Sequence, residues 1–161
     1  MPTAKDVIRT TLDSADMVLG AYIGDLTDEE LLVPPGEGMN PIAWQVGHLI
    51  ASEKMMVDQL RPGASPALPA GFAEAHDKTT AAPNAFKPFC SKDEYLRLAK
   101  AQREATLAAL DAVTDAQLDA ETGVSYAPTG AAMMNMVGVH ILMHVGQFVT
   151  VRRKLGKPVV I

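Results

Sequence analysis

Two histidines interrupt an almost entirely apolar segment near the C-terminal end of the chain. His140 and His144 are four residues apart in the segment 131–151, and both fall on the stripe of apolar side chains that recurs there at helical spacing. A buried imidazole without a hydrogen-bonding partner costs on the order of 1 to 3 kcal/mol. Any fold that buries this stripe therefore has to supply partners for both rings.

The sequence predicts an all-α fold, a four-helix bundle of the up-down type. Four segments have the periodicity of amphipathic helices and carry capping residues: 3–23 with a cap at Thr3, 40–60 with Asn40 as the cap and Pro41 at the first helical position, 91–112 with a Ser91–Glu94 capping box, and 129–156 from Thr129 or Gly130 to Gly156. No segment shows a convincing strand pattern, and the length of 161 residues suits a single domain, 1–161.

A long connection separates the second and third predicted helices. Residues 61–90 contain seven prolines and glycines, which exclude a long regular element. A connection of this length often borders a functional site or spans the end of a bundle. Shorter turns are expected at 26–31 and 114–118, and in an up-down-up-down arrangement the second and fourth helices run parallel.

A third histidine, His48, lies on the core-facing stripe of the second predicted helix. Residues four apart on a helix differ by about 40° in azimuth and about 6 Å in height, so His140 and His144 can reach one ion. His48 lies about 10 Å along its helix and the pair roughly 15 to 21 Å along theirs, close enough for the three rings to meet. The sequence therefore predicts a metal site of His48, His140 and His144.

Three neutral imidazoles suit zinc, nickel, iron(II) or copper and leave a coordination position open for water or substrate. The alternative is that the histidines are hydrogen-bonded core residues at a chance spacing. The segment lacks the glutamate of a zinc protease and the Glu-x-x-His of a di-iron bundle. Haem held by two histidines stays open, although no C-x-x-C-H is present.

Three polar residues lie at helical spacing from the predicted ligands. Gln45 and Ser52 flank His48, and Gln147 follows His144 by one turn, so each could orient a ligand or a bound water. Ordinary polar packing is the alternative for all three.

Four other features are assigned structural roles. Glu53 lies about 140° round the helix from His48 and is expected in solvent or in an inter-helix pair. His76 is expected at the surface, and Cys90 is expected to be a small buried hydrophobe rather than a thiol activated by a helix N-terminus. The nine methionines are attributed to core filling rather than to soft-metal binding.

Composition excludes several classes of partner. The net charge of −5 argues against general binding of nucleic acid or anionic membranes, and the Arg152–Lys154 cluster is assigned to a cationic helix end rather than to anion recognition. The segment 131–151 has the length of a membrane span, but its polar side chains argue against one. With one cysteine and no apolar leader expected, we predict a cytoplasmic protein.

Three patches resemble the DinB-like (YfiT-type) family: Trp44-Gln45-Val46-Gly47-His48-Leu49, His140-x-x-x-His144-x-Gly146-Gln147, and Arg152-Arg153-x-Leu155-Gly156-Lys157-Pro158. The resemblance implies a four-helix bundle, often a homodimer, whose three histidines hold a divalent metal, here through His48, His140 and His144. Related proteins are transferases or isomerases that use low-molecular-weight thiols, and others are metal-dependent hydrolases. Family members often carry His and Arg on either side of the second histidine, where this chain has Met143 and Val145.

The leading functional hypothesis is a metal-dependent enzyme of the thiol-dependent S-transferase type acting on a small-molecule substrate. The ion, zinc, nickel or iron, would hold a low-molecular-weight thiol as the thiolate. A metal-dependent hydrolase is one alternative. A non-catalytic bundle that binds a small ligand or a partner around a structural metal is the other.

Overall fold

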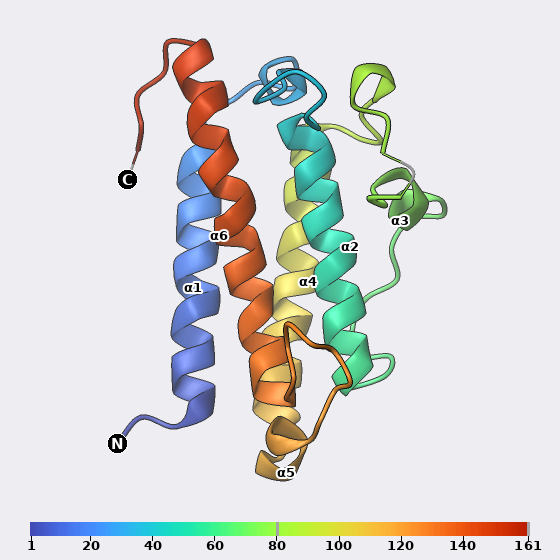
Figure 1. Ribbon diagram of the computed structural model, residues 1–161, viewed down its shortest axis with the longest axis vertical. Helices are drawn as coiled ribbons and strands as arrows, with labels where there is room; N and C mark the ends of the chain where they lie inside the picture. The colour runs from blue at the N-terminus through green and yellow to red at the C-terminus, as the bar shows by residue number, and fades with distance from the viewer. Residues whose placement is uncertain (80, 161) are drawn as a thin grey trace.

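The computed structural model describes residues 1–79 and 81–160, and within them the chain is all-helical (Figure 1). The elements in order are α1 (Ala4–Ile23), η1 (Glu30–Leu32), α2 (Ile42–Leu60), α3 (Phe72–Ala75), η2 (Pro83–Ala85), α4 (Lys92–Ala112), α5 (Asp115–Asp119) and α6 (Gly130–Lys154). No strand forms in the described ranges, and the only β-type pairing there is an isolated bridge between Glu121 and Thr129. The all-α prediction is confirmed.

Local capping signals locate most of the helix ends. The Thr3 side chain accepts from the Asp6 amide and the Asp6 side chain reaches back to Thr3, a complete capping box at the start of α1. Thr129 likewise accepts from the Ala132 amide at the start of α6. That helix ends before Gly156, whose φ of +69° is in the left-handed region that favours glycine.

Two predicted caps differ in detail. Pro41 is the N-cap of α2 rather than its first helical residue, and no side chain caps this end. Ser91 accepts from the Glu94 amide as expected, but the Glu94 carboxylate pairs with Arg97 instead of returning to the cap. The exposed guanidinium three residues on competes successfully for that carboxylate.

The four long helices do not alternate in direction as predicted. Lys5, at the start of α1, donates to the carbonyls of Asp111 and Val113 at the end of α4, while Arg152, near the end of α6, donates to the Tyr22 carbonyl near the end of α1. Helices α1 and α6 therefore run one way, and α2 and α4 run the other (Figure 1).

The predicted long connection is responsible for this topology. The described parts of this connection, 61–79 and 81–91, lead back to the end at which α2 began, so α2 and α4 are parallel while α2 and α6 are antiparallel. The expectation that the second and fourth long helices are parallel was wrong. The histidines still meet because they lie far from the ends of α6, where reversing the helix changes their height little.

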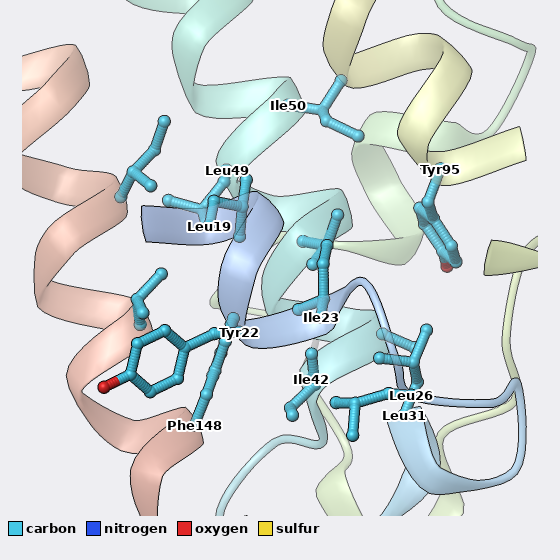
Figure 2. Packing of buried hydrophobic residues seen from close by; sticks show 14 of the residues in the cluster. Leu19, Tyr22, Ile23, Leu26, Leu31, Ile42, Leu49, Ile50, Tyr95 and Phe148 are labelled. Atoms are coloured by element: carbon cyan, nitrogen blue, oxygen red, sulfur yellow. The ribbon is translucent and has the colours of Figure 1, made fainter. Parts of the chain in front are cut away.

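Two clusters of buried apolar side chains fill the interior. One contains the C-terminal half of α1, the first half of α2 and residues of α4 and α6, and Figure 2 shows Tyr22, Ile23, Ile42, Tyr95 and Phe148 within it. The other joins Leu12, Val57, Leu110 and Met133 at the opposite end of the molecule.

Helix α6 is long and apolar enough to cross a membrane when judged by length and composition alone. The central helix of a folded domain meets the same criteria. Here α6 packs against α1, α2 and α5 and buries Met133, Val137, Ile141 and Phe148 between them.

Candidate metal centre

The three histidines predicted from the sequence lie together where α2 packs against α6. His48 is in the second turn of α2, and His140 and His144 occupy successive turns in the middle of α6. One possible ligand atom from each ring can be chosen so that all three atoms lie within 4.8 Å of one another. All three side chains are half-buried.

The closest approach is between the two rings of α6. The Nε2 atoms of His140 and His144 are 3.2 Å apart. Two nitrogens bound to one tetrahedral ion at 2.0 to 2.1 Å would be separated by about 3.3 Å. The three possible ligand atoms are up to 4.8 Å apart, so the rings would have to move slightly closer together to bind one ion.

Hydrogen bonds from the outer nitrogens orient two of the three rings. His48 Nδ1 donates to the His76 backbone carbonyl over 3.0 Å, and His144 Nδ1 donates to Gln45 Oε1 over 2.7 Å. The Gln45 amide is itself fixed because its Nε2 donates to the Asn40 carbonyl over 2.8 Å. Since both acceptors are oxygens, each ring carries its proton on Nδ1 and presents a bare Nε2 to the site.

Burial keeps the α6 histidines neutral. Desolvation, reinforced by the neighbouring imidazoles, lowers the pKa of His140 and that of His144 to about 4. Neutral rings are the form that binds a metal ion. The Nε2 lone pairs of His48 and His144 converge beside the His140 ring, and this group of nitrogen donors fits a divalent cation.

A pocket of about 840 Å³ opens on this site. His48 and His140 line it, whereas His144 lies behind them and is oriented by Gln45. Most of the remaining wall is apolar, and its polar residues are Ser52, His76, Asp77, Lys78 and Tyr126. A ligand in the pocket would therefore approach the histidine site from the His48 and His140 side.

The three polar residues predicted to orient ligands make different contacts in the structure. Gln45 does contact a ligand candidate, but it is His144 on α6 rather than His48 on its own helix. Ser52 Oγ lies 3.5 Å from His48 Nε2, on the open side of the ring. Within the described part of the chain, no hydrogen bond joins Gln147 to any of the three rings.

His76 was expected at the surface and is instead fully buried, with 0% of its surface exposed. The proline-rich connection folds back over α2, so that the His76 ring packs against Gly47 and hydrogen-bonds to Phe72 and Tyr95. Composition gave no sign of this burial, because it depends on the path of a long connection. The glycine at position 47, inside a predicted helix and next to His48, was the sequence signal that another segment of the chain approaches α2 closely there.

Trp44 also contacts the histidine site, a role that the sequence pattern did not indicate. Its ring stacks on His48 with centroids 4.9 Å apart and planes 9° apart. The two residues are one helical turn apart, a spacing that brings side chains of one face into contact. The indole therefore restricts rotation of the His48 ring from one side.

Glu53 forms the inter-helix pair that was one of its two predicted roles. Arg103 of α4 donates to both oxygens of Glu53 over 2.9 and 3.0 Å, and Thr106 donates to one of them. Both partners of the ion pair are about 7% exposed. These contacts commit the Glu53 carboxylate to the interface between α2 and α4 and away from the histidines.

Cys90 is partly buried, and the packing role predicted for it is confirmed. It packs against the first apolar cluster and lines a different, smaller cavity with Asp28, Lys92 and Tyr95. Desolvation, helped by nearby carboxylates, raises the pKa of its thiol to about 11. A thiol with that pKa is protonated at neutral pH and is a poor nucleophile.

Core filling accounts for only some of the methionines, so the prediction was wrong for the exposed ones. Met56, Met133 and Met134 are buried in the second cluster, as core filling predicts. Met55 and Met143 are mainly exposed and line the pocket beside His48 and His140. Their thioethers form a flexible apolar wall rather than part of the ligand group.

These features define an all-helical domain with a three-histidine site at the mouth of an apolar pocket. The sequence profile of the DinB superfamily matches residues 11–148. The chain belongs to the DinB superfamily, as its three sequence patches suggested.

A solved structure shares the fold over the full length of both chains. It is described as the crystal structure of the conserved protein of locus from Enterococcus faecalis, with a TM-score of 0.72 and 16% sequence identity. The similarity covers 98% of this chain and 100% of the other. At that identity the likeness concerns the fold alone. No curated protein matches the chain.

Proposed function

We propose that this protein binds one divalent metal ion, zinc, nickel or iron, through His48, His140 and His144. The observation that carries the proposal is the convergence of the three rings, with the Nδ1 protons of His48 and His144 held by oxygen acceptors so that their Nε2 lone pairs face inward. In metalloproteins, a hydrogen bond from the non-ligating ring nitrogen to an oxygen acceptor fixes the tautomer of the histidine that binds the metal.

The ion would keep at least one coordination position open toward the pocket. Among the described residues, the ligand group contains three histidines and no cysteine or carboxylate. A structural zinc site requires four protein ligands, whereas three are typical of a catalytic one. This makes a non-catalytic bundle with a closed structural metal the less favoured alternative.

The reaction we propose is transfer of a low-molecular-weight thiol to a small electrophilic substrate. A bound divalent ion lowers the pKa of a coordinated thiol and so supplies a thiolate at neutral pH. The thiol has to come from outside the chain, because Cys90 lines another cavity and its pKa is raised to about 11. The flexible wall of Met55, Met56, Met136 and Met143 suits an apolar electrophile.

A metal-dependent hydrolase is the second candidate, and Asp77 is the observation in its favour. This carboxylate lines the same pocket, and hydrogen bonds from Thr79 lower its pKa, so it is ionised at neutral pH. An ionised carboxylate near a metal-bound water could accept its proton. Glu53 cannot take this role because Arg103 and Thr106 occupy its oxygens.

Turnover assays distinguish the two reactions. Protein loaded with each metal is incubated with a panel of low-molecular-weight thiols and a model electrophile, and in parallel with model esters and amides. S-transfer that needs the metal and is abolished in His48→Ala supports the transferase. Hydrolysis without any thiol dependence supports the hydrolase, and activity in neither series leaves the non-catalytic binding module.

We also propose that the protein is a cytoplasmic homodimer that binds a small molecule rather than nucleic acid or a membrane. The dimer rests on the family resemblance, and the net charge of −5 supports the absence of nucleic acid binding. Light scattering that finds a monomer at working concentrations would remove the dimer from the proposal.

A further inference from the structure

His76 lies in a buried chain of hydrogen bonds that leads from α4 to His48. Tyr95 donates its hydroxyl proton to His76 Nε2 over 2.8 Å, and His76 Nδ1 donates to the Phe72 carbonyl over 2.7 Å. The Tyr95 oxygen in turn accepts from the Phe89 amide over 3.1 Å. Each nitrogen of the His76 ring thus has a partner of the correct type.

The packing around the His76 ring fixes its position. A β-carbon added at Gly47 would lie 2.2 to 2.6 Å from three atoms of the ring, so only glycine allows this approach to α2. The Phe72 ring also packs against the His76 ring, with centroids 4.4 Å apart, and is itself fully buried in the first apolar cluster. Tyr95 extends from α4 into that cluster (Figure 2).

The backbone of the same residue holds the metal-site histidine. The His76 carbonyl accepts the Nδ1 proton of His48 over 3.0 Å. Ala73, Asp77 and Lys78, on either side of His76, form the outer wall of the pocket. Locking the His76 ring therefore fixes both the acceptor that selects the His48 tautomer and the wall that faces the ion.

We infer that His76 is a positioning residue for the metal centre, and that Tyr95 and Gly47 act through it. The ring ties the connection between α2 and α4 to both helices, and its carbonyl keeps the His48 Nε2 lone pair directed at His140 and His144. None of these three residues is itself a ligand. The inference rests on the proposed metal site for its consequence, although the tautomer it predicts exists without a metal.

The experiment compares Tyr95→Phe, Gly47→Ala and His76→Phe with the wild type, using Tyr22→Phe as the control. Tyr95→Phe removes only the hydroxyl that donates to His76, so it tests the inference even if the larger changes impair folding. Tyr22, on α1, is another buried tyrosine, and its ring lies beside the guanidinium of Arg152 on α6. Two quantities are measured: the Kd for Zn²⁺ by competition with a chelator, and the His48 tautomer in metal-free protein by nitrogen-15 NMR.

Tyr95→Phe is expected to weaken Zn²⁺ binding about tenfold and His76→Phe by up to about 100-fold, the range seen when partners of ligating histidines are lost. The fraction of His48 protonated on Nε2 should rise in both and in Gly47→Ala, whose β-carbon displaces the His76 ring, and neither quantity should change in Tyr22→Phe. An unchanged His48 tautomer in Tyr95→Phe and His76→Phe overturns the inference, even if Zn²⁺ binding weakens. If the wild type binds no Zn²⁺ but the tautomer shifts as expected, the proposed function fails and the positioning role stands.

Discussion

The Gln45 side chain on α2 holds the His144 ring on α6, with 2.7 Å between Gln45 Oε1 and His144 Nδ1. The contact crosses the interface between the two helices that carry the histidines. Gln45 is 2% exposed, and its amide nitrogen is occupied by the Asn40 carbonyl, so the oxygen has one orientation available. The buried amide therefore fixes which nitrogen of His144 faces the site.

Gln45→Leu should weaken Zn²⁺ binding by about 10- to 100-fold, because His144 loses the acceptor that keeps its proton on Nδ1. Gln147→Leu is the matched control, since this glutamine is one turn along the same face from His144 and makes no hydrogen bond to the rings among the described residues. Competition with a chelator gives the Kd of each variant. Equal Kd values for the two variants would show that the Gln45 contact is irrelevant to binding.

The Glu53–Arg103 pair should contribute to stability without contributing to metal binding. Arg103→Met leaves a buried carboxylate without its counter-ion and is expected to lower the free energy of unfolding by about 3 kcal/mol. Urea unfolding measures this loss, and the Zn²⁺ affinity of the folded variant should equal that of the wild type. A double variant, Glu53→Leu with Arg103→Met, should recover part of the stability because the buried Glu53 charge is removed, although the half-exposed Asp16 still loses its ion pair with Arg103.

Two glycines of α6 should respond in opposite ways to alanine. A β-carbon at Gly138 would lie 2.9 Å from Thr11 Cγ2 and 3.0 Å from the Thr11 carbonyl oxygen, so Gly138→Ala should force α1 and α6 apart and lower the melting temperature. At Gly146 nothing lies within 4 Å, and Gly146→Ala should stabilise the helix by about 0.5 to 1 kcal/mol. Thermal unfolding of both variants decides the matter, and a stabilised Gly138→Ala would contradict this packing of α1 on α6.

The Arg152–Asp25 ion pair should make the free energy of unfolding depend on pH in the acidic range. Hydrogen bonds from the buried Arg152 guanidinium hold the pKa of Asp25 at about 2, below its usual value of about 3.9. Because the pKa is lowered on folding, the stabilisation is fully present above about pH 5, begins to decrease near the ordinary pKa of about 3.9 and is lost as the pH falls toward 2. Asp25→Asn should be less stable than the wild type at pH 6, and the difference should shrink steadily between pH 4 and pH 2.

The same pair shows what the basic cluster at the end of α6 does. Arg152 is 2% exposed and ties the ends of α1 and α6 through the Tyr22 carbonyl and Asp25. Lys154 donates to the Pro34 carbonyl in the turn before α2. The cluster therefore places positive charge at the end of α6, as predicted, and it also joins α6 to the end of α1 and to the turn before α2.

Local chemistry in the sequence was enough to predict the long helices and the three histidines. Thr3 and Thr129 cap their helices through hydrogen bonds to residues three positions away, and the spacing of His140 and His144 is fixed by the helix itself. These signals depend only on residues close together in the sequence, so they do not depend on how the helices pack against one another.

The same local signals could not predict contacts between residues that are far apart in the sequence. The direction of α6 relative to α2 depends on where the 61–91 connection leads, and the partner of Gln45 depends on that direction. The burial of His76 depends on a contact with Tyr95, nineteen residues away. A composition rule that places histidines in proline-rich loops at the surface carries no information about such contacts.

The proposed site is tested most directly by its metal stoichiometry. Purified protein is equilibrated with excess Zn²⁺, freed of unbound ion and analysed for metal per chain, alongside the double variant His140→Ala, His144→Ala. The wild type should retain about one ion per chain and the double variant less than about one tenth. Retention below one tenth by the wild type, or equal retention by both proteins, would contradict a metal centre at His48, His140 and His144.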